Sequence, residues 1–115
     1  MVFDKGFSRD EFSCKCKCGF DTVDVETLFV LEELKRWLGK RVYITSGCRC
    51  HAYNAFMNGS KNSYHTQGRA ADISVEDVDP IDVYGYLDRL YPDKYGIGKY
   101  KTFVHIDTRA NKARW

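Results

Sequence analysis

The stretch SYHTQGRAADIS, from Ser63 to Ser74, places a glycine directly before an expected strand. RAADIS (69–74) has the composition of a strand, and Gly68 comes immediately before it. Because glycine adopts backbone conformations that other residues avoid, a turn at Gly68 could bring His65 back beside Asp72. The chain holds only 3 histidines, and one of them lies in this stretch. The segment therefore predicts both a structural turn and a candidate site.

A second histidine lies in TFVHIDTR (102–109), near the end of the chain. If this run is a strand, His105 and Asp107 point to the same side, ~7 Å apart along the strand. Val104 and Ile106 then point to the opposite side, toward a core. An apolar pair on one face and a polar pair on the other indicate a strand that displays a site.

The remaining pattern mixes helices and strands. Apolar residues at spacings of three and four predict an amphipathic helix over Val25–Leu38, with Asp24 as its cap and Gly39 at its end. Pro80 predicts the start of another helix, with Asp79 as its cap. Further expected elements are a strand at RVYIT (41–45), a short helix at HAYNAFMN (51–58), a loop at GSKNS (59–63), and strands at about 95–97 and 102–107. We predict an α+β fold with a small antiparallel sheet backed by helices, in a single domain over residues 1–115.

Composition narrows the classes of function. The chain is 43% hydrophobic and 30% charged, which is ordinary for a globular protein and does not indicate disorder. The formal net charge is +2, with Lys and Arg scattered among acids, so we expect no nucleic-acid partner. No segment approaches the ~20 apolar residues of a membrane helix, so we expect no membrane partner. The N-terminal residues show no signal-peptide pattern, which predicts synthesis in the cytoplasm.

Five cysteines are many for 115 residues, and they occur as CKCKC (14–18) and CRC (48–50). Three interpretations remain open. The thiols could be free, or one or two disulfides could tie the N-terminal segment to the Arg49 loop. The third is a structural zinc site, which ranks last because no two cysteines have C-x-x-C spacing.

The residue types around the two histidines suit a metal ion. His65, Asp72 and His105 would supply two imidazole nitrogens and a carboxylate, a set that holds catalytic zinc and leaves a fourth position for water. The alternative is that these are ordinary surface or hydrogen-bonding residues. Spacing alone leaves both interpretations open.

Several segments together resemble the zinc D-alanyl-D-alanine carboxypeptidase family of peptidoglycan peptidases. The family motif S-x-H-x-x-G-x-A-x-D is matched in order by Ser63, His65, Gly68, Ala70 and Asp72. Supporting segments are SGCRC (46–50), YNA (53–55), NSYHTQGRAADI (62–73), GIGKY (96–100) and FVHIDT (103–108), and the resemblance covers about residues 12–115. It implies a fold shared with the N-terminal domain of hedgehog proteins.

The resemblance also implies one zinc ion per chain, held by His65, Asp72 and His105. The implied substrate is the peptidoglycan stem peptide, cut by a carboxypeptidase or by an endopeptidase such as L-alanyl-D-glutamate phage lysins. We expect a monomer that acts on the cell wall or in the periplasm. The absence of a signal peptide and of a wall-binding module favours a phage-type endolysin, and a bacterial enzyme exported by another route is the alternative.

Roles for the remaining site residues follow from the same resemblance. Arg49 would stabilise the developing negative charge or grip a substrate carboxylate. Asp107 would be the general base, or would orient a ligand histidine. Thr102 and Phe103 stand where many relatives carry the base, and neither can accept the proton. Substrate contacts are expected from Ser63 and Gln67, in addition to Arg49.

Two functions of other classes stay open. One is a non-catalytic zinc module that binds wall peptide or a protein partner. The other is a redox or structural-metal protein built on the cysteines, which the lack of C-x-x-C spacing disfavours.

Overall fold

The structure is a computed structural model that describes residues 7–19, 21–57, 59 and 63–115. Residues 1–6 and most of the predicted loop at 59–63 lie outside the described residues. A five-stranded sheet forms the centre, with strand order β1-β2-β4-β3-β5. The strands are β1 (Val42–Ser46), β2 (Ala70–Val75), β3 (Gly96–Lys99), β4 (Val104–Asp107) and β5 (Ala113–Arg114).

The sheet is mixed, which corrects the prediction of a purely antiparallel sheet. β1, β2, β4 and β3 pair antiparallel, but β5 runs parallel to β3. A strand of two residues is too short to show a period, so β5 could not be predicted from the residue pattern. The last strand satisfies backbone groups on the open edge of β3, because Trp115 N donates to Ile97 O. The α+β class is confirmed in this coarser form, whereas the likeness to hedgehog proteins stays a prediction.

The described residues include three α-helices, α1 (Val25–Leu38), α2 (His51–Phe56) and α3 (Pro80–Leu90). α1 begins and ends as predicted. The Asp24 side chain accepts a hydrogen bond from Glu26 N at 3.1 Å, and Gly39 adopts a left-handed φ of 62°. Asp79 occupies the capping position of α3 but makes no capping hydrogen bond with its side chain. Two short 3-10 helices, η1 (Arg9–Phe12) and η2 (Tyr64–Gln67), were not predicted.

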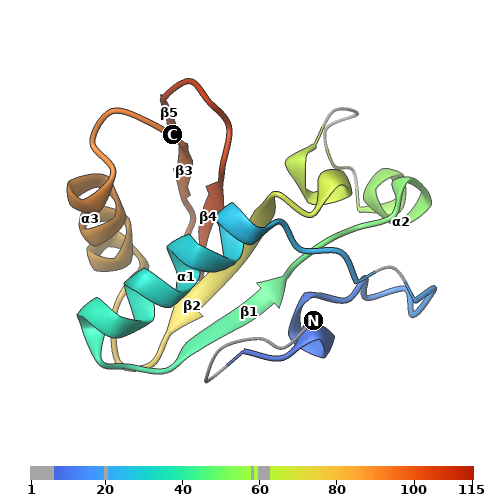
Figure 1. The fold of residues 1–115 in the computed structure, drawn as a ribbon, viewed down its shortest axis with the longest axis horizontal. Coiled ribbons are helices and arrows are strands. Elements are labelled where there is room, and N and C mark those ends of the chain that lie inside the picture. The colour runs from blue at the N-terminus through green and yellow to red at the C-terminus, as the bar shows by residue number, and fades with distance from the viewer. Residues whose placement is uncertain (1–6, 20, 58, 60–62) are drawn as a thin grey trace.

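One face of the sheet carries the hydrophobic core. Ile73, Val104, Ile106 and Ile97 are fully buried on this face, together with apolar side chains of α1 and α3. α1 lies across the sheet and α3 lies beside β3 (Figure 1). The prediction that Val104 and Ile106 face the core is confirmed. The alternate residues of β2 and β4 therefore point to the opposite face, where the polar side chains gather.

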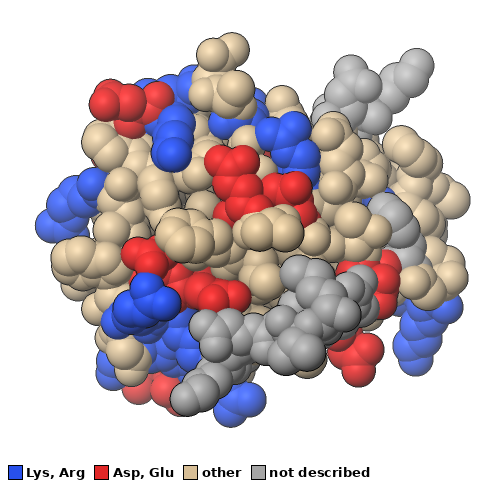
Figure 2. All heavy atoms as spheres, viewed as in Figure 1, with Lys and Arg blue, Asp and Glu red and all other residues tan. Residues whose placement is uncertain are grey.

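One face of the molecule carries charges of both signs. On the described part of the face in Figure 2, Lys and Arg side chains are interspersed with Asp and Glu. Among the described residues, no helix has the length and apolar character needed to cross a membrane.

Candidate metal centre and active site

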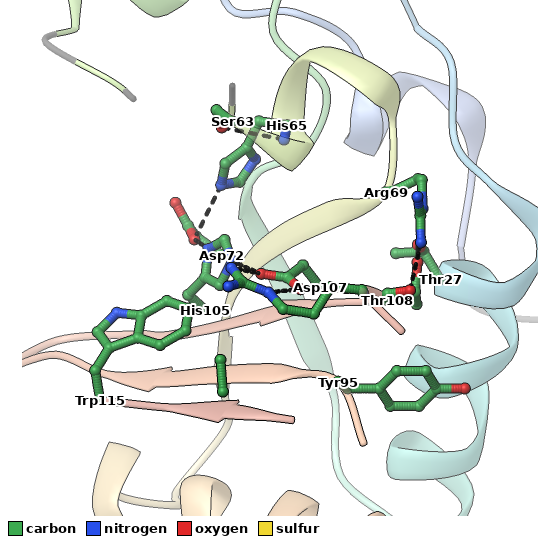
Figure 3. Close-up of polar contacts among 12 residues, drawn as sticks. Thr27, Ser63, His65, Arg69, Asp72, Tyr95, His105, Asp107, Thr108 and Trp115 are labelled. Atoms are coloured by element: carbon green, nitrogen blue, oxygen red, sulfur yellow. Dashed lines mark hydrogen bonds and ion pairs between the residues drawn. The ribbon is translucent and has the colours of Figure 1, made fainter. Parts of the chain in front are cut away.

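Three predicted ligands meet on the face of the sheet opposite the core. The Asp72 carboxylate lies between the two histidines, with its Oδ1 3.3 Å from His65 Nε2 and 3.0 Å from His105 Nδ1. One ligand atom from each residue lies within 4.8 Å of the others. Figure 3 shows His65 reaching toward Asp72 from above the sheet, with His105 beside it.

The turn at Gly68 brings His65 to this position. His65 lies in η2, and Gly68 ends η2 with a left-handed φ of 68°. Ser63 caps the start of η2, because its side chain accepts a hydrogen bond from His65 N at 3.2 Å. Arg49 N donates to His65 O at 2.9 Å and ties the turn to the neighbouring loop. The predicted turn is thus present, in the form of a short 3-10 helix.

Strand register supplies the other two side chains. Asp72 on β2 pairs directly with His105 on β4, so the two side chains emerge side by side on one face. His105 also pairs with Gly98 on β3, and a Cβ at Gly98 would lie 2.4 Å from the Trp115 ring. A glycine at this position therefore leaves room for Trp115, whose ring centre lies 5.3 Å from that of His105.

Each histidine has one ring nitrogen engaged by another group. His65 Nδ1 lies 2.6 Å from the carbonyl oxygen of Gly47, which can only accept, so this nitrogen donates. His105 Nε2 lies 2.7 Å from Asp107 Oδ2 and donates to it in the same way. In the neutral rings, His65 Nε2 and His105 Nδ1 are left as acceptors facing the Asp72 carboxylate. Three acceptors at such short distances require protons or a cation between them, and their chemistry fits zinc.

The ionisation of this group follows from its contacts. Burial alone would raise the pKa of Asp72, but hydrogen bonds with His105 and His65, when these rings are protonated, outweigh it and hold the pKa below its usual range. Burial would lower the pKa of His105, but its hydrogen bonds to Asp107 and Asp72 raise it. The site thus favours a negative charge on Asp72 and a positive charge close to it.

Asp107 is fully buried beside His105, and nitrogen donors of His105 and Arg109 contact its carboxylate. Arg109 Nη2 lies 2.8 Å from Oδ2, and Arg109 Nε donates to Oδ1 at 2.8 Å. Burial would raise the pKa of Asp107, but these hydrogen bonds and that from His105 keep it below its usual range. Sequence reasoning missed Arg109, although its position two residues after Asp107 places both on one side of an extended chain.

Arg49 contacts the Asp72 carboxylate through Oδ2, whereas the two histidines contact Oδ1. Its Nη2 lies 3.3 Å from Asp72 Oδ2, and its Nε donates to Ser46 Oγ at 3.2 Å. Nη1 contacts Asn54 Oδ1 at 3.4 Å, and Asn54 is buried. The guanidinium is therefore held in a fixed orientation next to the candidate metal ligands. The role of Asn54 was not foreseen, because the sequence motif YNA does not reveal which way the amide points.

A pocket opens over the three ligands, with an aromatic wall. Tyr100 and Phe103 stack with ring centres 4.5 Å apart, and Trp115 Nε1 donates to the Tyr100 hydroxyl at 2.8 Å. The described residues that line the pocket are Arg49, Met57, Gly59, Ser63, Tyr64, His65, Asp72, Tyr100, Phe103, His105, Asp107, Arg109 and Trp115. Of the predicted substrate contacts, Arg49 and Ser63 are in the lining. Gln67 is exposed and lies outside it.

Comparison with protein families agrees with this geometry. The family model described as Peptidase M15 matches residues 5–107. The chain belongs to the peptidase M15 family. The resemblance to zinc D-alanyl-D-alanine carboxypeptidases and related peptidoglycan peptidases is therefore confirmed. No curated protein matches the chain.

Membership of the M15 family indicates the general class of enzyme. The family consists of zinc-dependent peptidases, so the prediction of a hydrolase of the metallopeptidase class is supported. The described residues contain two groups that could hold a metal ion. One is His65, Asp72 and His105, and the other is Cys14, Cys16, Cys18 and Cys50.

Proposed function

We propose that this M15 chain hydrolyses peptide bonds of the peptidoglycan stem peptide with one zinc ion held by His65, Asp72 and His105. The observation that carries the proposal is the convergence of His65 Nε2 and His105 Nδ1 on Asp72 Oδ1, at 3.3 and 3.0 Å. The opposite nitrogen of each ring is already engaged, so these lone pairs are oriented before an ion binds. When bound, zinc supplies a Lewis acid and lowers the pKa of a bound water.

Arg49 supplies positive charge at the pocket. Its guanidinium is held by Ser46 and Asn54 and contacts Asp72, so little reorganisation is needed when substrate binds. Such a fixed cation suits either the oxygen of a carbonyl under attack or the carboxylate of a stem peptide. Because Arg49 lines the pocket, we propose that it contacts substrate.

Asp107 acts through His105 in this proposal. Its Oδ2 accepts from both His105 Nε2 and Arg109, and its Oδ1 accepts from Arg109, so both oxygens are occupied. A carboxylate that is fully buried and has a lowered pKa is a weak proton acceptor. The geometry therefore favours the second of the two roles expected for Asp107, which is orientation of a ligand histidine.

The aromatic wall suits a peptide substrate. Tyr100, Phe103 and Trp115 offer flat apolar surface, and Ser63 offers a hydroxyl at the rim. The fragments that the enzyme releases would distinguish carboxypeptidase action from endopeptidase action. Action on the wall by a phage-type endolysin remains part of the proposal.

One observation favours a second candidate, a zinc module that binds wall peptide without cutting it. Among the described residues that line the pocket, the two carboxylates are Asp72 and Asp107, and both are engaged by the contacts above. A binding module requires no free base.

Digestion of isolated peptidoglycan separates the two candidates. We expect the zinc-loaded protein to release peptide fragments, which mass spectrometry would identify together with the bond cut. His65→Ala should abolish the release, whereas His51→Ala, which makes the same chemical change at an exposed position, should preserve it. Zinc binding without fragments from several wall types would overturn the peptidase and favour the binding module.

A further inference from the structure

Four cysteines gather in a second group, which shares no residue with the three zinc ligands proposed above. Cys14, Cys16 and Cys18 come from the loop after η1, and Cys50 comes from the start of α2. Their sulfur atoms all lie within 4.8 Å of one another. We call this group the four-cysteine cluster. The fifth cysteine, Cys48, is buried and is not part of it.

The sulfur spacing matches a tetrahedral metal site. Cys14 Sγ lies 3.4 Å from Cys16 Sγ and 3.8 Å from Cys50 Sγ, and Cys16 and Cys50 are 3.7 Å apart. Four thiolates around zinc, each at about 2.3 Å, place their sulfur atoms about 3.8 Å from one another. A disulfide would need about 2.05 Å. Cys14, Cys16, Cys18 and Cys50 form no disulfide in the structure, so the distances indicate non-bonded sulfur atoms held around a common centre.

The backbone explains how C-x-C-x-C spacing reaches this arrangement. In an extended strand, alternate side chains point the same way but lie ~7 Å apart. Here Lys17 N donates to Cys14 O at 3.0 Å, and Lys17 has a left-handed φ of 65°. The resulting turn draws the three sulfur atoms together. The lack of C-x-x-C spacing made a zinc site the last of the three interpretations of the cysteines. This turn lets C-x-C-x-C spacing bring the sulfur atoms together instead.

The sulfur atoms also accept hydrogen bonds from the backbone. Cys50 N donates to Cys14 Sγ at 3.4 Å, and Tyr53 N donates to Cys50 Sγ at 3.4 Å. Such contacts stabilise sulfur in the thiolate form, which is the form that binds metal. Lys15 and Lys17 alternate with the cysteines and are exposed, so they can offset the negative charge of four thiolates around a divalent ion.

We propose that Cys14, Cys16, Cys18 and Cys50 bind a structural zinc ion, in addition to the ion at His65, Asp72 and His105. Four protein ligands leave no open position for water, as in zinc sites that stabilise a fold. The inference does not depend on the proposed peptidase activity.

The contacts around the cluster show what this ion would stabilise. Cys48 N donates to Phe12 O at 2.9 Å, and a Cβ at Gly47 would lie 2.6 Å from the Phe12 backbone. The end of η1, just before Cys14, therefore packs closely on the loop that contains Gly47 and Arg49. That loop accepts the hydrogen bond of His65 and contacts Asp72, so the second ion would fix the support of the candidate metal centre.

Metal analysis of the full chain, combined with cobalt substitution, tests this proposal. We expect two zinc ions per chain, and cobalt in their place should give intense thiolate-to-metal absorption in the near ultraviolet. Cys16→Ser with Cys18→Ser, both at exposed positions, should lose one ion and this absorption. Cys48→Ala removes a thiol from the same region and should keep both. His65→Ala should lose the other ion and keep the thiolate absorption, which separates this proposal from the proposed function.

Two results would overturn the structural zinc site. One is a cobalt-loaded wild-type protein without thiolate absorption, a measurement that does not depend on whether the variants fold. The other is a mass lower by two hydrogens for each pair of cluster cysteines, which would show disulfides instead of a metal site.

Discussion

Asp107 contacts one of the three candidate metal ligands and is not itself one of them. It accepts from the ring nitrogen of His105 that does not contact Asp72, and Arg109 holds it in place through both oxygens. A carboxylate in this position fixes the ring and makes the opposite nitrogen a better ligand. Buried charge without these partners would be costly, so Asp107 and Arg109 act as a pair.

Asp107→Asn should weaken zinc binding about 10- to 100-fold, because the amide retains the shape but loses the charge that supports His105. Competition with a chelator would measure this change. Asp88→Asn is the control, since it alters another aspartate paired with an arginine, Arg114, at 2.8 Å. Unchanged zinc affinity with loss of hydrolysis would instead identify Asp107 as the general base.

Arg49→Gln should lower the turnover number about 10²- to 10³-fold, the cost of removing one group that stabilises developing charge. The three ligands remain, so zinc content should not change. Kinetics on a defined stem peptide, with metal analysis of the same sample, would measure both. Arg41→Gln removes an exposed charge near the start of β1 and should leave the rate unaltered. A normal rate in Arg49→Gln would exclude the proposed role.

Among the elements, those with a clear period or cap could be predicted and those fixed by tertiary contacts could not. α1 has apolar residues at helical spacing between an aspartate cap and a glycine, so its bounds followed from the sequence. η2 has no such pattern, and its shape depends on Ser63 and Gly68. β5 forms by pairing with the edge of β3, and the residues around Ala113 have no pattern that predicts this pairing.

Gly68→Ala tests the element that carries His65. A Cβ at Gly68 would lie 2.7 Å from Thr22 O and would also require an unfavourable φ. Gly39→Ala is the matched control, since it has the same left-handed conformation with no atom within 4 Å of its Cβ. We expect Gly39→Ala to cost about 1–2 kcal/mol in the free energy of unfolding. Gly68→Ala should cost more and should also weaken zinc binding. Urea unfolding and chelator competition measure these effects, and equal costs in the two variants would contradict this account of the turn.

At the scale of the whole molecule, the sheet has the hydrophobic core on one face and the candidate metal centre on the other. α1 and α3 lie against the sheet (Figure 1). Ile73 and Ile106 belong to the core that these helices cover, and the opposite face presents Asp72 and His105. Strand alternation allowed this division to be predicted from the sequence. The partners of the ligands could not be predicted in the same way. The contact between His65 and the Gly47 carbonyl joins residues 18 positions apart, and it depends on how two loops pack.

Anomalous diffraction at the zinc edge, from crystals of the purified chain, would locate an ion held by His65, Asp72 and His105. We expect a peak among His65 Nε2, Asp72 Oδ1 and His105 Nδ1, absent in His65→Ala crystals and retained in His51→Ala crystals. A zinc-loaded crystal without a peak at these three atoms, or with the ion bound by other residues of the pocket, would contradict this prediction.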